Sequence, residues 1–137
     1  MYKKLFIVSL LLASQHLFAE TGQQPAPDQV VAGKALYEQY CLACHGENGV
    51  GEPPIPATIR APGYLTAMPL NERSHAWHHS DEQLVETILE GLQRTGRMPA
   101  RKGVVTPDQA IQLVAYIKSF WSPRIVACQG PRHVSCM

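Results

Sequence analysis

A stretch rich in Gly and Pro, residues 46–69, most restricts the folds open to this chain. It reads GENGVGEPPIPATIRAPGYLTAMP and shows neither the apolar period of a helix nor the alternation of a strand. The whole chain has 137 residues, and an irregular segment of this length is unusual in so small a domain. It becomes compatible with a stable fold if it packs against something other than protein. The sequence therefore predicts a long loop that wraps a large buried cofactor.

Amphipathic helices are predicted on both sides of this loop. Apolar residues at helical spacing indicate a helix over residues 29–44, with Asp28 as its N-cap. A second helix is expected to begin after Ser80, because Ser80 and Gln83 match a capping box. No alternating strand pattern and no internal repeat is visible. The pattern favours an all-α domain with long loops.

A third helix is predicted after Thr106, which would cap it with Pro107 at the first helical position and Gln109 at the third. Ser122-Pro123 is expected to end this helix. The formal net charge of the chain is +1, which is too little for a typical DNA- or RNA-binding module. We therefore expect no nucleic-acid partner.

The motif Cys41-Leu42-Ala43-Cys44-His45 carries the most specific chemical signal. Two thiols three positions apart lie on neighbouring corners of a helical turn and can add to the two vinyl groups of one haem. The following His45 would then supply an axial imidazole to the iron, as in the C-x-x-C-H signature of haem c. Two other interpretations are a thioredoxin-type redox pair and a zinc site. The zinc site would need further ligands from the C-terminal cysteines and His133.

A six-coordinate haem needs a second axial ligand, and Met98, followed by Pro99, is the predicted one. Its thioether would favour ferrous iron and raise the reduction potential. The position between two predicted helices lets Met98 approach the haem face opposite His45. Met68, in the Gly- and Pro-rich loop, is the competing candidate and could instead cover the haem edge.

These motifs resemble those of class I monohaem c-type cytochromes, the bacterial periplasmic cytochrome c family, from about Gly33 to Trp121. The resemblance implies the all-α cytochrome c fold, with three to five helices and long loops wrapped around one covalently bound haem c. It also implies a crossing of the first and last helices, with Gly33 at the close approach. A loop-proline carbonyl would hold the second ring nitrogen of His45, and the candidates are Pro53, Pro54 and Pro56.

The first 19 residues are predicted to be a signal peptide, with Lys3 and Lys4 ahead of a short apolar run and Ala19 before the cut. An uncleaved membrane anchor is the alternative. Export implies a periplasmic location, haem-attachment machinery during maturation, and no stable membrane insertion after leader cleavage. Loss of the two lysines lowers the formal charge from +1 to −1. Residues 20–28 are predicted to be a flexible tether and residues 29–122 the cytochrome domain.

Residues 123–137 form a C-terminal extension that holds Cys128 and Cys136. In an oxidising compartment these two cysteines are expected to form a local disulfide, worth about 2–3 kcal/mol in the chain-entropy model. Alternatively, they could bind copper together with His133 and Met137, or act as a redox dithiol.

A second group of unusual residues comprises His75, Trp77, His78 and His79. A solvated loop with one packed indole is the simplest interpretation of this segment. The alternatives are a bond from Trp77 to a haem propionate and a histidine acting as an axial or metal ligand.

The predicted function is a periplasmic electron carrier, not an enzyme, whose single haem alternates between Fe(II) and Fe(III) with His45 and Met98 as ligands. Its partners would be a redox protein donor and acceptor. The alternatives are a haem-containing accessory protein that handles copper or thiols through the C-terminal tail, and a small haem subunit of a larger oxidoreductase. A peroxidase or gas-binding haem protein would need an open or labile sixth iron site.

Overall fold

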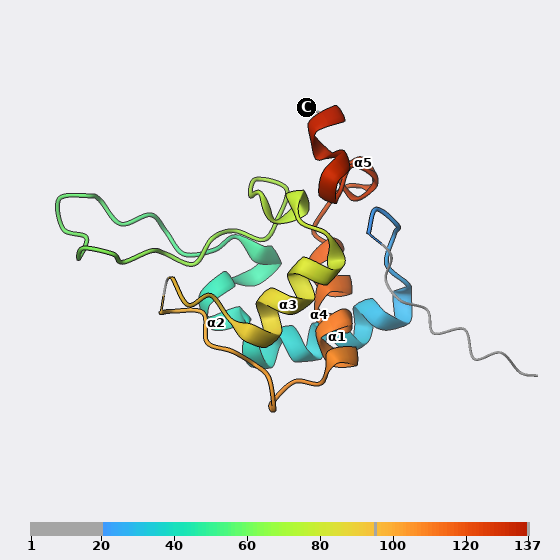
Figure 1. The fold of residues 1–137 in the computed structure, drawn as a ribbon, viewed down its shortest axis with the longest axis horizontal. Helices are drawn as coiled ribbons and strands as arrows, with labels where there is room; N and C mark the ends of the chain where they lie inside the picture. Colours follow the sequence, from blue (N-terminus) through green and yellow to red (C-terminus); the bar gives the residue numbers. More distant parts are fainter. Residues whose placement is uncertain (1–20, 95, 137) are drawn as a thin grey trace, which may run out of the picture.

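The computed structural model describes residues 21–94 and 96–136, and these residues form five α-helices and three short 3-10 helices with no strand among them (Figure 1). The all-α prediction is confirmed. The predicted signal peptide, residues 1–19, and Met137 lie outside the described residues. None of the helices in the described part of the chain has both the length and the apolar character needed to cross a bilayer.

Helices α1 (Pro27–Tyr40) and α4 (Pro107–Lys118) cross and make the largest helix contact of the fold. Gly33 lies at the crossing, where an added Cβ would stand 1.9 Å from the carbonyl oxygen of Gln112. Next to it, the buried Tyr37 packs edge-on against Tyr116 and Phe120, with ring centroids 5.2 and 5.6 Å away. The close approach expected at Gly33 is therefore present.

Capping boxes begin both α3 (Asp81–Glu90) and α4, as the sequence predicts. Ser80 accepts from the backbone N–H of Gln83, whose side chain accepts from the Ser80 N–H, and Thr106 and Gln109 repeat the exchange. Three expected boundaries are wrong. The helix expected over residues 29–44 ends at Tyr40 instead of Cys44. Helix α1 begins at Pro27 with Ala26 as N-cap, because proline fits the first helical position and places Asp28 inside the first turn.

The third corrected boundary is the end of α4, which stops at Lys118 instead of reaching Ser122-Pro123. Ser122 instead caps the short helix α5 (Pro123–Ala127), with Pro123 at its first position. The same Ser-Pro pair that was expected to stop a helix thus starts the next one. A 3-10 helix, η3 (Gly130–Ser135), completes the described C-terminal extension.

A buried ion pair joins α3, α4 and the C-terminal extension. The ammonium of Lys118 lies 2.8 Å from a carboxylate oxygen of Asp81, and their side chains are 0% and 5% exposed. The side-chain amide of Gln129, which is also fully buried, donates to the other oxygen of Asp81. The two charges are therefore paired and hydrogen bonded, which a buried ion pair requires.

The N-terminal segment lies against the C-terminal extension. The N–H of Gly22 donates to Gln129, the guanidinium of Arg132 donates to the carbonyl of Thr21, and the Gln24 amide donates to the carbonyl of Pro123. Part of the region predicted to be a tether, residues 20–28, thus makes tertiary hydrogen bonds or belongs to α1.

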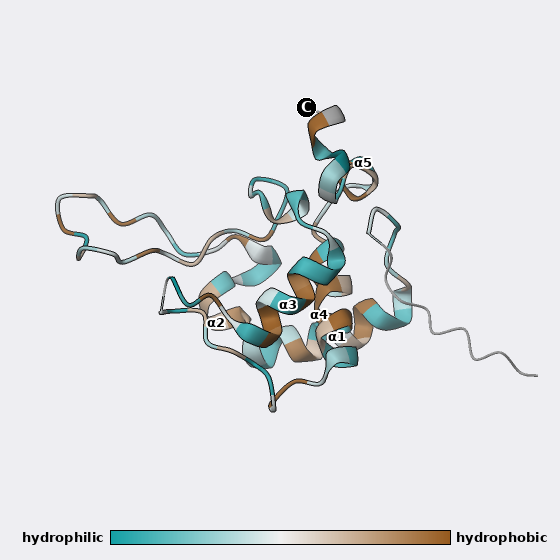
Figure 2. Ribbon diagram, in the orientation of Figure 1, coloured by the Kyte–Doolittle hydropathy of each residue, from teal (hydrophilic) through white to brown (hydrophobic). Residues whose placement is uncertain are grey.

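The core lies where α1, α3 and α4 meet, and the Gly- and Pro-rich segment projects away from it. Figure 2 shows hydrophobic residues concentrated along these three helices. In Figure 1 the green loop between α2 (Leu42–His45) and α3 extends far from the helices before it returns. Its only helical turns are the 3-10 helices η1 (Glu47–Gly49) and η2 (Ala76–His78). The ends of the loop return to the helices and line the site described next.

Candidate functional site

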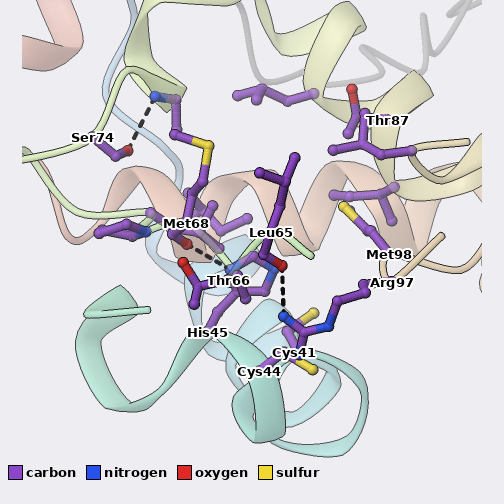
Figure 3. Close-up of a pocket in the computed structure, with 18 of the residues that line it drawn as sticks. Cys41, Cys44, His45, Leu65, Thr66, Met68, Ser74, Thr87, Arg97 and Met98 are labelled. Carbon is purple, nitrogen blue, oxygen red and sulfur yellow. Dashed lines mark hydrogen bonds between the residues drawn. The ribbon is translucent and has the colours of Figure 1, made fainter. Parts of the chain in front are cut away.

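A cavity of about 310 Å³ lies between α2, α3, the returning end of the long loop and the segment after α3 (Figure 3). It collects the cysteines and histidine of the C-x-x-C-H motif together with both candidate methionines. The remaining lining is mostly apolar and aliphatic. The described residues that line it include Tyr40, Cys41, Cys44, His45, Leu65, Met68, Leu70, Ser74, His75, Ala76, His79, Leu84, Ile88, Leu92, Arg94, Arg97, Met98, Arg101 and Ile117.

The C-x-x-C-H motif forms a separate helical turn. The backbone kinks at Cys41, where φ is −121°, so that α1 ends and α2 begins. The carbonyl of Cys41 accepts from the N–H groups of Cys44 and His45, which holds the three side chains on one turn. Both cysteines are free thiols. The structure thus brings the predicted residues together at one wall of the cavity.

The environment of the Cys41 thiol does not activate it as a nucleophile. Burial raises its pKa to about 11, an effect that Arg101 opposes and Cys44 reinforces. Cysteines that exchange disulfides or bind metals have lowered pKa values instead. The environment of Cys41 therefore disfavours the thioredoxin-type interpretation.

His45 is held by a carbonyl that the sequence interpretation did not select. Its Nδ1 lies 2.9 Å from the backbone oxygen of Met68, so Nδ1–H donates there and Nε2 is left with its lone pair. The expectation of a carbonyl from Pro53, Pro54 or Pro56 is wrong. Those prolines lie in the projecting part of the loop, and Met68 lies where the loop returns. Burial lowers the pKa of His45, which favours the neutral form that binds metals.

Met98 lies on the segment that follows α3, and its side chain packs against the core. The backbone carbonyl of Met98 accepts from the N–H of Leu92. The chain from Met98 to Ala100 also passes close to Gly91, at the end of α3. An added Cβ at Gly91, where φ is +70°, would lie 2.6 Å from the Met98 carbonyl oxygen. Met68 also reaches the cavity but is 45% exposed. Of the two methionines, Met98 is the less exposed.

Arginines provide the only charged side chains among the described lining residues. Arg101 donates to the carbonyl of Tyr40, and Arg97 forms a two-bond ion pair with Glu52. The sequence interpretation missed both contacts. No spacing signal marks either contact, because each joins segments far apart in the sequence. Arg94 is the third lining arginine.

The histidine-rich segment separates into two sides. Ser74, His75 and His79 line the cavity, whereas the rings of Trp77 and His78 contact His133 of the C-terminal extension. The His78 and His133 rings stack at 4.3 Å. Trp77 is 9% exposed, and its Nε1 has no hydrogen-bond partner within the described chain.

Acidification should loosen this contact between η2 and the C-terminal extension. Burial lowers the pKa of His78, and nearby His133 adds to the effect. Stability from neutral His78 is complete above about pH 6.5 and is lost as the pH falls through its lower folded-state pKa. We expect His78→Asn to reduce the fall in melting temperature between pH 7 and pH 5. His79→Asn is the control, because His79 has the smallest effect of the neighbouring histidines on the pKa of His78, and it should change this fall less. An equal dependence of melting temperature on pH in the unmodified protein and both variants would contradict the assignment to His78.

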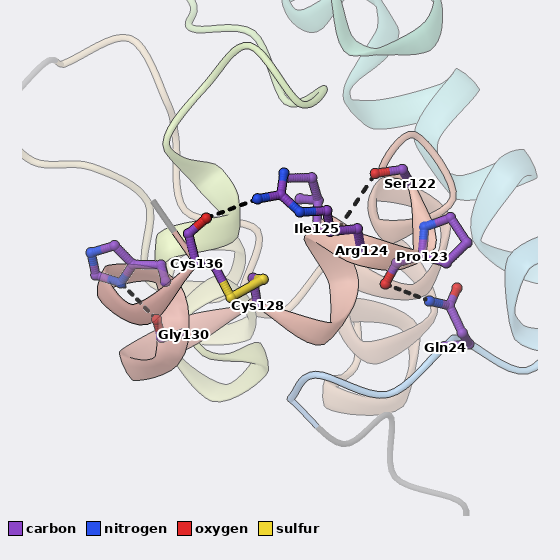
Figure 4. The surroundings of a disulfide bond; sticks show 9 residues. Gln24, Ser122, Pro123, Arg124, Ile125, Cys128, Gly130 and Cys136 are labelled. Carbon is purple, nitrogen blue, oxygen red and sulfur yellow. Dashed lines mark hydrogen bonds between the residues drawn. A yellow bond between two sulfur atoms is a disulfide. The ribbon is translucent and has the colours of Figure 1, made fainter.

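The C-terminal extension places Cys128 and Cys136 together, with their sulfur atoms at the 2.02 Å of a disulfide (Figure 4). Arg124 donates to the carbonyl of Cys136, and Nδ1 of His133 lies 2.7 Å from the carbonyl of Gly130. Within the part of the chain that the structure describes, no three His, Cys, Asp or Glu side chains are grouped to hold a metal ion. This arrangement favours a bridge over a copper site.

The residues around the cavity fit a haem. Two thiols stand on one helical turn, and an imidazole and a thioether reach the same space, which is the donor set of haem c. The walls are apolar, as a porphyrin requires, and Arg94 and Arg101 add positive charge for the propionates, whereas the charge of Arg97 is paired with Glu52.

Comparison with known proteins agrees with this chemistry. The family model described as cytochrome c oxidase, cbb3-type, subunit III, matches residues 28–117. The chain is 31% identical over 88 residues to the cbb3-type oxidase subunit FixP of Bradyrhizobium sp. (strain ORS 278), covering 64% of this chain and 26% of that protein. It is 36% identical over 70 residues to the subunit CcoP of Azospirillum brasilense, covering 50% and 20%.

A relative from a different enzyme has similar identity. The quinohemoprotein alcohol dehydrogenase ADH IIB of Pseudomonas putida is 31% identical over 94 residues, which are 69% of this chain and 11% of that protein. The chain thus spans about a quarter or less of the length of these relatives. No solved structure matches.

Proposed function

Because this chain belongs to the family of cytochrome c oxidase, cbb3-type, subunit III, and is a c-type cytochrome domain for electron transfer, we propose that it carries electrons in the periplasm with one covalently bound haem c. The observation that carries the proposal is the convergence of Cys41, Cys44, His45 and Met98 on one apolar cavity. When bound, haem supplies one-electron oxidation and reduction.

Each residue of the site has a separate task in this proposal. Cys41 and Cys44 would form the two thioether bonds, which would hold the cofactor in a domain too small to enclose it fully. The Nδ1–H of His45 donates to the Met68 carbonyl, which fixes the ring and leaves Nε2 to hold the iron. Met98 would hold the iron through its thioether sulfur. With these four residues holding it, the haem would supply electron transfer and leave no site for a substrate at the iron.

The spectrum of the ferric protein, made with the haem-attachment machinery, tests this assignment. We expect the absorption band of methionine–iron coordination in the unmodified protein and its complete loss in Met98→Ala. Met68→Ala is the matched control, because Met68 reaches the same cavity, and it should retain the band. Retention of the band in Met98→Ala, or binding of carbon monoxide by the untreated ferrous protein, would contradict the proposal.

The extension adds a structural element to this proposal. We infer that Cys128 and Cys136 form a disulfide in the oxidising periplasm and fasten η3 to α5. That pairing removes both thiolates from metal binding, so a copper-handling role has little support.

A role within a complex is the second candidate, and the relatives named as oxidase subunits favour it. In this case the haem domain would exchange electrons with a larger oxidoreductase. Fractionation separates the two candidates. A free carrier is recovered with the released periplasmic proteins, whereas a subunit is recovered with a haem-containing membrane complex of much larger mass.

A further inference from the structure

Two loops, one for each proposed axial ligand, meet beside the cavity. The first returns from the long projection and supports His45 through the carbonyl of Met68. The second follows α3 and carries Met98. Glu52 belongs to the first loop and Arg97 to the second, 45 positions apart in the sequence. Figure 3 shows Arg97 directed toward the backbone carbonyl of Leu65.

The contact between Arg97 and Glu52 is bidentate. Two guanidinium nitrogens donate to the two carboxylate oxygens at 2.6 and 2.7 Å, the parallel geometry of the strongest ion pairs. Arg97 also donates to the carbonyl of Leu65 at 2.7 Å, and its guanidinium lies 4.4 Å from the centre of the Tyr64 ring. The two charged side chains are only 28% and 26% exposed. Water therefore screens this pair less than an ordinary surface pair.

Glu52 connects the pair to the support of His45. Its carboxylate accepts from the N–H of Ala67 at 2.7 Å, and its own N–H donates to the Ala67 carbonyl at 3.0 Å. The next residue, Met68, holds His45. The hydrogen bonds to Arg97 lower the pKa of Glu52 to about 2, so the carboxylate is ionised at neutral pH.

We propose that the Arg97–Glu52 ion pair positions Met98 by fastening its loop to the loop that supports His45. This inference rests on the proposed ligation by His45 and Met98. Arg97 precedes Met98 directly, so release of its guanidinium frees the chain next to the ligand. Both residues are positioning residues, because neither supplies an iron ligand. Removing the pair increases the population in which Met98 has left the iron.

Added imidazole measures that population, since it binds ferric iron only where Met98 has left. Its apparent affinity rises in proportion to the open fraction. We expect Glu52→Gln to tighten imidazole binding about tenfold, the effect of weakening a charge-assisted pair. Arg97→Gln should give a similar change. The double variant should resemble either single variant, because each substitution removes the same interaction.

Glu90→Gln is the matched control. Glu90 pairs with Lys102 near the same segment, but that pair is 55% and 73% exposed and joins α3 only to the chain just after Met98. Its loss should leave imidazole affinity unchanged. Urea unfolding of every variant measures its global stability. The gain in imidazole affinity should be larger than the loss in the free energy of unfolding alone would produce.

The outcomes separate the two proposals. If the unmodified protein shows the methionine–iron band and Met98→Ala loses it, the ligand assignment holds. Unchanged imidazole affinity in Glu52→Gln, or additive effects in the double variant, then overturns the positioning role alone. If the unmodified protein lacks the band, the assignment of Met98 fails, and the positioning role fails with it.

Discussion

Replacement of Gly33 by alanine should lower the free energy of unfolding by about 3 kcal/mol or more, at the upper end of overpacking effects. In an unrestricted helix the same change would stabilise, since alanine favours helices by about 1 kcal/mol over glycine. At this position the new Cβ would lie 1.9 Å from the Gln112 carbonyl oxygen and 2.9 Å from the Cβ of Tyr116. Helices α1 and α4 must therefore separate, which disrupts the packing of Tyr37. Denaturant unfolding monitored by far-UV circular dichroism measures the change.

Gly103→Ala provides the comparison for this prediction. Among the described residues, apart from the two chain neighbours, no atom lies within 4 Å of the Cβ that would be added there, although φ is +83°. We expect only the backbone cost of a left-handed alanine, about 1–2 kcal/mol. A loss at Gly33 no larger than the loss at Gly103 would mean that the two helices can move apart at little cost.

Replacement of Lys118 by methionine should cost about 3–5 kcal/mol, because it leaves the Asp81 carboxylate buried without its cation. Both side chains are at most 5% exposed, so water cannot replace the lost partner. The hydrogen bond from Gln129 is retained but does not neutralise the charge. Thermal and denaturant unfolding of the haem-loaded protein would measure the loss.

A second substitution separates charge burial from lost packing. Asp81→Asn combined with Lys118→Met removes both charges, and most of the stability should return. Lys34→Met breaks an exposed pair with Glu38, whose side chains are 60% and 55% exposed, and should change stability by no more than about 0.5 kcal/mol. If the double variant is as unstable as Lys118→Met alone, unpaired charge is not the cause.

Local signals in the sequence predict much of this fold. Ser80 with Gln83, and Thr106 with Gln109, each lie within one helical turn, so their capping boxes can be identified from spacing alone. Cys41, Cys44 and His45 likewise belong to one continuous turn. The crossing at Gly33 was expected from the resemblance to c-type cytochromes, and the structure has it.

Other features depend on contacts that spacing does not encode. The partner of His45 is a backbone carbonyl, which every residue possesses, so nothing in the side chain of Met68 identifies it. In the sequence, Lys118 and Asp81 resemble the ordinary surface charges of two amphipathic helices. Only the fold buries them together, with Gln129 of the C-terminal extension bonded to Asp81. The Glu52–Arg97 pair joins two loops whose relative placement depends on the whole fold.

Two hydrogen bonds between Glu52 and Ala67 close the base of the projecting loop. The length of the loop beyond this base is therefore independent of the cavity where the redox chemistry takes place. Closing a longer loop costs little, since each doubling of length adds only about 0.6 kcal/mol of entropy. Residues 53–63, which do not line the cavity, can therefore be inserted or deleted without altering the geometry around it. The loop acts as a spacer whose length natural variation or protein engineering can change independently of the reduction potential.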